Sequence, residues 1–259
     1  MLFKIIYCIF VVSNIVEHKN MQNIERQFMH TFVSVDCVIF GFDKEKLNVL
    51  LVQRNAPTLN GKDLKLPGSL IYQEEEDADK AAYRVLKELT GINKMMLKQF
   101  KSFTSPDRTS NPDDVAWLEV AYNNKIDRLI TVAYLSLIKI DRKINIVSKY
   151  KTVDWCPLDH LPQMPFDHNQ IVEESLKEIR SWVEYDPAVM FELLPTKFTA
   201  ADLRHLFEAI YGKKLDVRNF HKKILSMGYV VPLEERQQGV SHRAARYYKF
   251  DKVIYRRNK

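Results

Sequence analysis

One run of residues in the first half of the chain limits its possible fold more than any other feature. The short apolar stretch 64–66 is followed by Pro67-Gly68, by an acidic segment, and by residues 77–89, where apolar side chains recur at helical spacing. Gly91 then ends the helix, because glycine adopts the left-handed conformation of a helix C-cap at little cost. The sequence therefore predicts a strand, a turn, an acidic loop and an amphipathic helix, in that order.

Stretches rich in β-branched and aromatic residues surround this helix and predict a β-sheet. Residues 105–127 are predicted to be a long polar connection, and residues 169–185 a further helix. The predicted strands are residues 31–42, 47–54, 95–103, 129–140 and 151–156. We expect an α+β domain in which a mixed sheet is flanked by helices.

A different order of elements follows Pro195. Residues 199–211 predict a helix with Thr199 as its N-cap, and residues 216–227 predict a second helix. Two strands, 229–234 and 243–250, come next. The apolar side chains that we expect to face inward are Leu203, Leu206, Phe207, Ile210, Phe220, Ile224 and Leu225. Helix, turn, helix and hairpin is the order of a winged helix-turn-helix.

These elements divide the 259 residues into four parts. Residues 1–28 are interpreted as an N-terminal extension, residues 29–185 as the first domain, and residues 199–259 as the second. The segment 186–198 between them carries two prolines and is predicted to be the linker.

Charge is distributed unevenly between the two domains. Residues 196–259 carry 15 Lys and Arg against 6 Asp and Glu, a net charge of +9, whereas residues 1–195 carry a net −3. A basic C-terminal domain beside a mildly acidic body indicates a polyanionic partner for that domain. The alternative is a solvated surface whose asymmetry has no function.

The cysteines and the N-terminal residues indicate the cellular compartment in which the protein is expected. Cys8, Cys37 and Cys156 lie far apart without a metal-binding spacing, which is typical of a reduced, cytoplasmic protein, and Cys37 is expected to be a buried apolar residue. Residues 1–16 are mostly apolar, but they lack a signal-peptidase site and are short for a membrane span. We interpret residues 1–20 as a mis-assigned start or a poorly packed extension; the alternative is a secreted or membrane-tethered protein.

The helix at residues 77–89 resembles the catalytic box of the Nudix family. Arg84, Glu88, Gly91 and Ile92 match that motif in place, whereas Ser69 stands where the box normally starts with glycine. The stretch from Ser69 to the arginine is one residue longer than the family pattern. Either Glu75 or Glu76 could therefore be the first glutamate of the motif.

Two positions depart from the family at its chemistry. Val85 and Leu89 stand where the family has glutamates that hold Mg²⁺. Mg²⁺ requires several hard oxygen ligands in near-octahedral geometry, and Glu88 alone offers at most a weak site. The other interpretation of Glu88 is an i,i+4 ion pair with Arg84. We therefore predict no catalytic residue, no metal site and no cofactor, with Mg²⁺ required only if the domain is a hydrolase.

The second predicted helix of the C-terminal domain carries polar side chains suited to the DNA major groove. Lys222 and Lys223 are predicted to bind phosphate, while Arg218 and Asn219 could read guanine and adenine, and His221 faces the same way. The hairpin adds basic side chains suited to phosphate or minor-groove contact, Arg236, His242, Arg243 and Arg246. A solvated helical face is the alternative.

Taken together, residues 31–250 resemble the Nudix-related transcriptional regulators of bacteria, including the arabinose-type and NAD-type regulators. The resemblance rests on Phe198-Thr199, Leu215-Asp216, Arg218-Asn219-Phe220 and residues 243–250, with Leu161-Pro162 to His168 before the last helix of the first domain. It implies that a homodimer binds double-stranded operator DNA through the winged helix. It also implies that the Nudix-like domain binds a small effector.

The effector site departs from the family at residues 109–125, a polar insertion of the kind that often lines a ligand site. Arg54, Arg108 and Arg128 would suit an anionic effector such as ADP-ribose or a sugar phosphate, and a sugar is a further possibility. We predict these arginines and Glu88 as effector-binding residues; a surface ion pair is the alternative for each arginine.

The sequence bears on three functions. The sequence favours an effector-responsive transcriptional regulator that has no membrane partner. The alternative is a Nudix hydrolase acting on ADP-ribose or a related nucleoside diphosphate, which Val85 and Leu89 disfavour. A structural or protein-binding module explains neither the hairpin nor its charge.

Overall fold

The computed structural model describes residues 31–54, 63–72, 76–92, 95–140, 153–239 and 244–257. By their contacts, these residues form two compact units. One contains residues 31–33 and 104–130, and the other contains residues 34–103 and 131–257. The N-terminal residues 1–30, including the predicted extension, lie outside the described part.

A seven-stranded sheet forms the centre of the first predicted domain, and its strand order is β3-β2-β1-β6-β5, with β4 paired to β1 and β7 paired to β2. The strands are β1 (Thr31–Phe42), β2 (Leu47–Gln53), β3 (Leu64–Lys65), β4 (Gly68–Leu70), β5 (Lys98–Phe103), β6 (Arg128–Lys139) and β7 (Val153–Pro157). Every predicted strand is present. The structure adds β4, whose first residue, Gly68, belongs to the predicted Pro67-Gly68 turn.

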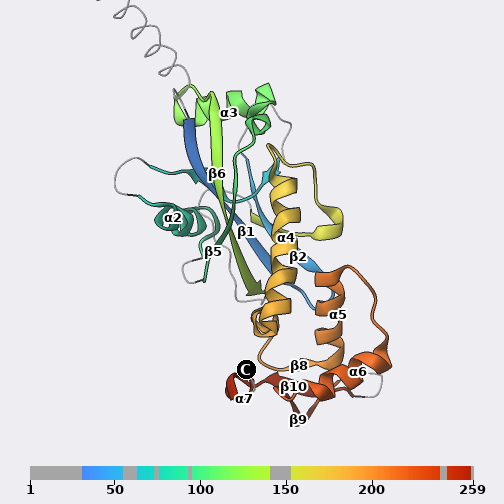
Figure 1. Cartoon of the computed structure of the whole chain (residues 1–259). Coiled ribbons are helices and arrows are strands. Elements are labelled where there is room, and N and C mark those ends of the chain that lie inside the picture. The colour runs from blue at the N-terminus through green and yellow to red at the C-terminus, as the bar shows by residue number, and fades with distance from the viewer. Residues whose placement is uncertain are drawn as a thin grey trace, which may run out of the picture. The chain divides into compact units, whose positions relative to one another are not determined.

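Alternating side chains of β1 build two cores, one on each face of the sheet. Val35, Cys37 and Ile39 pack with the buried side of α2 (Ala78–Thr90). On the other face, Val38, Phe40 and Phe42 belong to the cluster that includes α4 (His168–Tyr185). Figure 1 shows α2 and α4 on opposite sides of β1. The apolar run of β1 is buried on both faces for this reason.

The unit that contains residues 104–130 corrects one prediction. Residues 105–127 were predicted to be a polar connection, but they form the 3-10 helix η1 (Pro106–Thr109) and the helix α3 (Pro112–Tyr122). Asn111 caps the start of α3 by accepting a hydrogen bond from the Asp113 amide at 3.0 Å. Asn123 ends it in the left-handed conformation, with φ of 48°. The insertion is therefore helical rather than a long loop.

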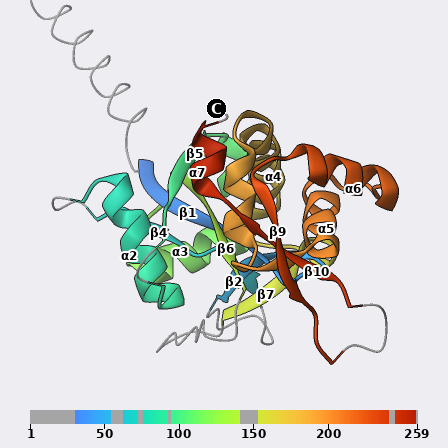
Figure 2. The same ribbon diagram turned by 90° about the horizontal axis from the view of Figure 1, so that it is seen from below.

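The C-terminal elements have the predicted order of a winged helix. They are β8 (Phe198–Thr199), α5 (Ala200–Tyr211), α6 (Val217–Ser226), β9 (Val230–Arg236), β10 (Arg246–Phe250) and α7 (Lys252–Arg257), and the three strands form a sheet in the order β8-β10-β9. Thr199 caps α5 through a capping box with Asp202, as predicted for the N-cap. Figure 2 shows α5 and α6 together with the β9–β10 hairpin.

The winged helix shares its core with the last helix of the first domain. Ile179 and Val183 of α4 belong to the same buried cluster as Leu203 and Leu206 of α5. The predicted linker contains the 3-10 helix η3 (Pro187–Leu193), whose Phe191 ring stacks on Phe250 of β10 at 4.3 Å between centroids. The segment between the domains is therefore packed rather than extended.

Candidate effector site and nucleic-acid interface

Helix α2 carries the Nudix-like box and is fixed at both ends. Asp77 caps its start by accepting a hydrogen bond from the Lys80 amide at 2.8 Å. Gly91 ends it with φ of 74°, as the sequence predicted. The helix buries Ala81, Ala82, Val85 and Leu86 against the sheet.

The two positions where the family has glutamates lie on the buried side of α2. Val85 is fully buried, and Leu89 packs against the same apolar cluster. Glu88 lies between them on the outer side, where 54% of its side chain is exposed. Its carboxylate is 3.4 Å from the Arg84 guanidinium, so the i,i+4 ion pair is present.

Arg84 holds the loop before the helix in place. Its Nε and Nη2 donate to the two carboxylate oxygens of Glu76 at 2.6 and 2.9 Å, and Nη2 also donates to the Leu70 carbonyl at 2.9 Å. The guanidinium lies over the Tyr72 ring at 3.9 Å. The hydrogen bond from Arg84 keeps the pKa of Glu76 below its ordinary value. The sequence pointed to Glu76 as a possible first glutamate of the box but did not predict this clamp.

The carboxylates around Arg84 do not fit a Mg²⁺ site. The carboxylate of Glu76 is bound by Arg84, Glu88 faces the same arginine, and aliphatic side chains occupy positions 85 and 89. Within the described ranges, no three carboxylate, histidine or cysteine side chains come together as a metal site would require. Glu75 lies outside the described residues.

The other predicted effector residues fall in both units. Arg54 is buried, and its side chain forms an ion pair with Asp63 while its amide donates to the Asp63 carbonyl at 2.7 Å. Arg108 is buried in η1, and Arg128 is exposed and donates to the Thr104 carbonyl at 3.1 Å, both within the unit of residues 104–130. Their common role in binding an effector, together with Glu88, remains a prediction.

Helix α6 exposes the predicted DNA-reading side chains. Asp216 caps it by accepting from the Asn219 amide at 2.8 Å, and Phe220 and Ile224 are its buried residues. All five predicted polar residues are exposed, namely Arg218, Asn219, His221, Lys222 and Lys223. Leu225 was predicted to pack inward, which is wrong: it is 78% exposed, because it lies on the solvent side of the helix next to Ile224.

The lysines of α6 differ in their surroundings. Lys223 places its ammonium 4.4 Å from the centroid of the Phe207 ring on α5, a cation–π contact. Arg218 and Lys222 have no ion pair within the part of the chain that the structure describes. Their charges are therefore available to a partner that carries negative charge.

The β9–β10 hairpin, the wing of the winged helix, brings two arginines together. Arg236 of β9 and Arg246 of β10 are directly opposite in the antiparallel register, and both are exposed. Arg236 also donates to the Ala244 carbonyl at 3.2 Å, which holds the base of the hairpin loop. His242 and Arg243, also predicted to bind DNA, lie outside the described residues.

Comparison with known families agrees with both halves of this architecture. The model of the NUDIX domain matches residues 30–184, more than half of the chain. This chain belongs to the Nudix family. The model of the NrtR DNA-binding winged helix domain matches residues 190–250, so the chain joins a Nudix domain to an NrtR-type winged helix.

Individual relatives match different extents of the chain. The chain is 26% identical over 222 residues to the ADPR responsive transcriptional repressor NtrR of Acinetobacter baylyi, covering 84% of this chain and 81% of that protein. It is 25% identical over 152 residues to the ADP-ribose pyrophosphatase of Methanocaldococcus jannaschii, covering 59% of this chain and 77% of that protein. The crystal structure of Shewanella oneidensis NrtR with a 27mer DNA superposes with a TM-score of 0.62 at 23% identity, covering 85% of this chain and 93% of that one, which shows the common fold.

The Nudix domain contains a buried polar cluster that sequence reasoning missed. His168, the first residue of α4, accepts a hydrogen bond from the Leu66 amide through Nδ1 at 3.2 Å. The ring proton is therefore on Nε2, which faces Asp36 Oδ1 at 3.6 Å. Lys65, also buried, donates to the Leu66 and Gly68 carbonyls at 3.1 and 3.0 Å. The start of α4 is thus bound to the segment that leads into the Nudix box.

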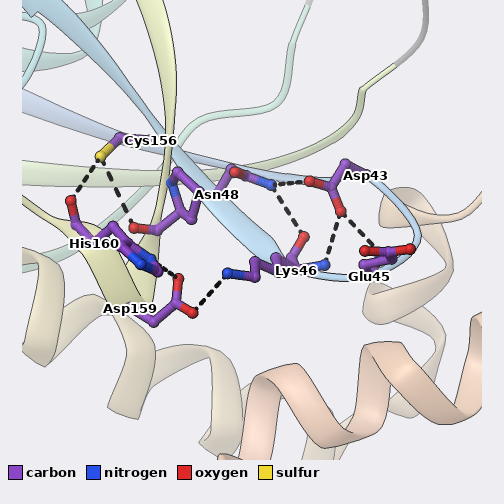
Figure 3. A network of polar contacts seen from close by, with 8 residues as sticks. Asp43, Glu45, Lys46, Asn48, Cys156, Asp159 and His160 are labelled. Carbon is purple, nitrogen blue, oxygen red and sulfur yellow. Dashed lines mark hydrogen bonds and ion pairs between the residues drawn. The ribbon is translucent and has the colours of Figure 1, made fainter.

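The β1–β2 turn of the Nudix domain lies against the winged helix. Figure 3 shows Asp43 accepting from the amides of Glu45 and Lys46 at 2.9 and 2.7 Å, while Lys46 Nζ donates to Asp159 at 2.8 Å. The carbonyl of Lys44, a residue with φ of 86°, is 3.3 Å from His205 Nδ1 of α5. The segment that α5 touches is therefore a turn held by hydrogen bonds.

At the other end of α4, Arg180 Nε donates to the Ile210 carbonyl of α5 at 2.8 Å. Glu208, buried in α5, accepts from Arg204 at 2.6 Å and from the Leu215 amide at 2.8 Å, which fixes the turn between α5 and α6. Burial raises the pKa of Glu208, but these hydrogen bonds outweigh it and leave the pKa lowered. Helix α4 is thus tied to the box segment at one end and to the DNA-reading domain at the other.

No helix in the described ranges is both long and apolar enough to cross a membrane.

Proposed function

We propose that this protein is an ADP-ribose-responsive transcriptional repressor. Its winged helix would bind operator DNA, and its Nudix domain would bind the effector without hydrolysing it. The observation that carries the proposal is the exposed face of α6, where Arg218 and Lys222 are free to meet phosphates and base edges. The similarity to a repressor named for its response to ADP-ribose supports the choice of effector.

Loss of hydrolysis is the second part of the proposal. A Nudix hydrolase stabilises the leaving phosphoryl charge with metal held by several carboxylates. In this chain Val85 and Leu89 are packed into the core, and the glutamates at positions 76 and 88 face Arg84. We therefore assign the domain to binding rather than to catalysis. The protein would act in the cytoplasm as a homodimer whose two α6 helices enter successive major grooves.

Helix α4 would carry the response from the effector to DNA. Its start is bound through His168 to the segment before the box, and its last turns are bound through Arg180 to α5. An effector that favours one position of this helix would shift the population of dimers whose α6 spacing fits the operator.

The test is a gel-shift titration on the region upstream of the protein's own gene, with and without ADP-ribose. We expect a specific complex that ADP-ribose dissociates, and no ADP-ribose turnover in millimolar Mg²⁺. The matched variant Lys222→Ala should weaken the complex while keeping ADP-ribose binding by calorimetry.

A Nudix hydrolase of ADP-ribose is the second candidate, favoured by the similarity to the archaeal pyrophosphatase. Mg²⁺-dependent turnover of about 1 s⁻¹ or faster, with no specific DNA complex, would establish it instead of the repressor.

A further inference from the structure

A cavity of about 670 Å³ lies where the Nudix domain, η3 and the C-terminal residues meet. Among the described residues, its walls come from the end of β6, from Trp182 and Asp186 at the end of α4, from η3, and from Phe250 and Tyr255. Its volume is within the range of small-molecule sites in proteins. None of the residues predicted to bind effector or DNA lines it.

The walls are mainly apolar and include three aromatic rings. Trp182, Phe250 and Tyr255 contribute these rings, and Leu135 and Met96 add aliphatic surface. Met96 is 71% exposed, so its side chain is accessible to an occupant. Such a lining suits a planar aromatic body, and methionine adapts its shape to different ligands.

The polar groups of the cavity are satisfied with two exceptions. Asp186 accepts from the Tyr255 hydroxyl at 2.6 Å and from the Ala188 amide at 3.0 Å, and Glu192 pairs with Lys252 at 3.3 Å. Burial and the hydrogen bond to Asp186 raise the pKa of Tyr255 to about 12. Lys139 and Arg256 have no ion pair in the residues that the structure describes, and both are exposed.

We propose that this cavity is a second ligand site, separate from the Nudix site, for a planar aromatic molecule that carries one anionic group. The aromatic walls would hold its body, and Lys139 and Arg256 would neutralise its charge. Because both domains contribute walls, an occupant would also favour one arrangement of the winged helix on the Nudix domain. This inference does not depend on the identity of the Nudix effector.

The probe is 8-anilinonaphthalene-1-sulfonate, an aromatic anion whose fluorescence rises in apolar sites. We expect saturable binding of one molecule per chain that excess ADP-ribose does not displace. Ala188→Trp, which places a large ring in the cavity, should abolish this binding. The double variant Lys139→Gln/Arg256→Gln should weaken it about fivefold, as expected for two exposed charges.

The control is Lys101→Gln/Lys177→Gln, which removes two cations that are paired with Glu174 and do not line the cavity. It should leave probe affinity unchanged. Folding of each variant is checked by cooperative thermal unfolding, and if Ala188→Trp does not fold, the charge variant alone decides. Unchanged affinity in the charge variant would overturn the proposal. So would a change from dimer to monomer in Ala188→Trp by light scattering, because the cavity would then be covered by a second copy.

Discussion

Arg236 and Arg246 stand directly opposite each other across the β9–β10 ladder, with both side chains exposed. Like charges in this position destabilise a hairpin, so the pair weakens the wing on its own. A phosphate backbone removes this repulsion by placing negative charge against both guanidinium groups. The pair therefore indicates that the wing is more stable when it is bound to DNA phosphates than when it is free.

The first prediction concerns this pair. Arg236→Gln/Arg246→Gln should lower the slope of log K against log salt for DNA binding by about 1.8, because each lost phosphate contact removes about 0.9. The melting temperature of the free protein should change little, because removal of the repulsion offsets the loss of the hydrogen bond from Arg236 to the Ala244 carbonyl. Fluorescence anisotropy across a salt series and thermal unfolding measure the two effects.

Lys249→Gln is the control for the wing, because this lysine of β10 is paired with Asp251 at 3.7 Å. It should change the salt slope less than either arginine does. A lower melting temperature together with an unchanged slope in the double arginine variant would show that the arginines support the hairpin rather than DNA binding.

The second prediction separates affinity from base reading on α6. Lys222→Ala should weaken binding to all DNA sequences similarly and lower the salt slope by about 0.9, as loss of one phosphate contact does. Arg218→Ala, near the start of the helix, should relax the base preference at one operator position by about 1–3 kcal/mol. A competition assay with single-base operator variants measures both.

Lys197→Ala is the control for α6, since its ammonium is bound to both carboxylate oxygens of Glu235 at 2.6 Å. Lys197→Ala should change the salt slope less than Lys222→Ala does, and the base preference less than Arg218→Ala does. If both α6 variants bind like the unmodified protein at every salt concentration, α6 is not the reading helix.

The third prediction concerns the ion pair between Arg84 and Glu76 in the Nudix box. Glu76→Gln removes the negative partner of Arg84, so it should reduce the free energy of unfolding at pH 7 by about 1.5–3 kcal/mol, as for hydrogen bonds to charged groups. Because the hydrogen bond lowers the pKa of Glu76, its stabilisation is present above the unfolded pKa of about 4.3 and is lost as pH falls through the folded value. The difference between Glu76→Gln and the unmodified protein should therefore shrink below about pH 4.

Urea unfolding at pH 7, 5 and 3.5 tests this dependence. Glu88→Gln is the matched control, because its carboxylate is more than half exposed and lies 3.4 Å from the same arginine. It should cost at most about 0.5 kcal/mol at any of these pH values. If Glu76→Gln and Glu88→Gln lower the free energy of unfolding equally, the Glu76–Arg84 pair does not stabilise the loop as proposed.

The sequence predicted most of the fold because its signals there are periodic. The alternation along β1 and the helical spacing of α2 and α5 are set by the core that each element covers. Helix α3 lacks such a signal: Val115 and Leu118 are three residues apart, but so are Trp117 and Val120 on another side of the helix, so no single apolar face forms, and Val120 is 78% exposed. The capping residue Asn111 and the proline after it were the local signals that could have identified this helix.

The site was less predictable for a related reason. Exposure of the five polar α6 side chains follows from helical periodicity, and the structure bears it out, whereas Leu225 was placed on the wrong side. Contacts between distant segments do not follow from periodicity. The pairing of Arg84 with Glu76 joins a loop to a helix, and the contact of His168 with the Leu66 amide spans 102 residues. Nothing in the local sequence of either partner specifies these contacts.

The fourth prediction concerns the coupling between the two domains. Arg180→Met keeps the aliphatic stem of the side chain but removes the donor to the Ile210 carbonyl, so α4 would no longer be bound to the end of α5 by this hydrogen bond. Coupling free energies between sites change by about 0.5–2 kcal/mol when such a contact is lost. ADP-ribose should therefore shift the operator affinity of Arg180→Met about 2–30-fold less than that of the unmodified protein.

Three titrations check the coupling: operator alone, ADP-ribose alone, and operator with saturating ADP-ribose. The first two affinities should stay within about twofold of the unmodified protein, because Arg180 belongs to neither predicted binding surface. Lys177→Met is the control one turn earlier on α4, since its ammonium pairs with Glu174 of the same helix and not with α5. A full ADP-ribose response in Arg180→Met would mean that the coupling passes elsewhere, and the contact of His205 with the β1–β2 turn would then be the next one to remove.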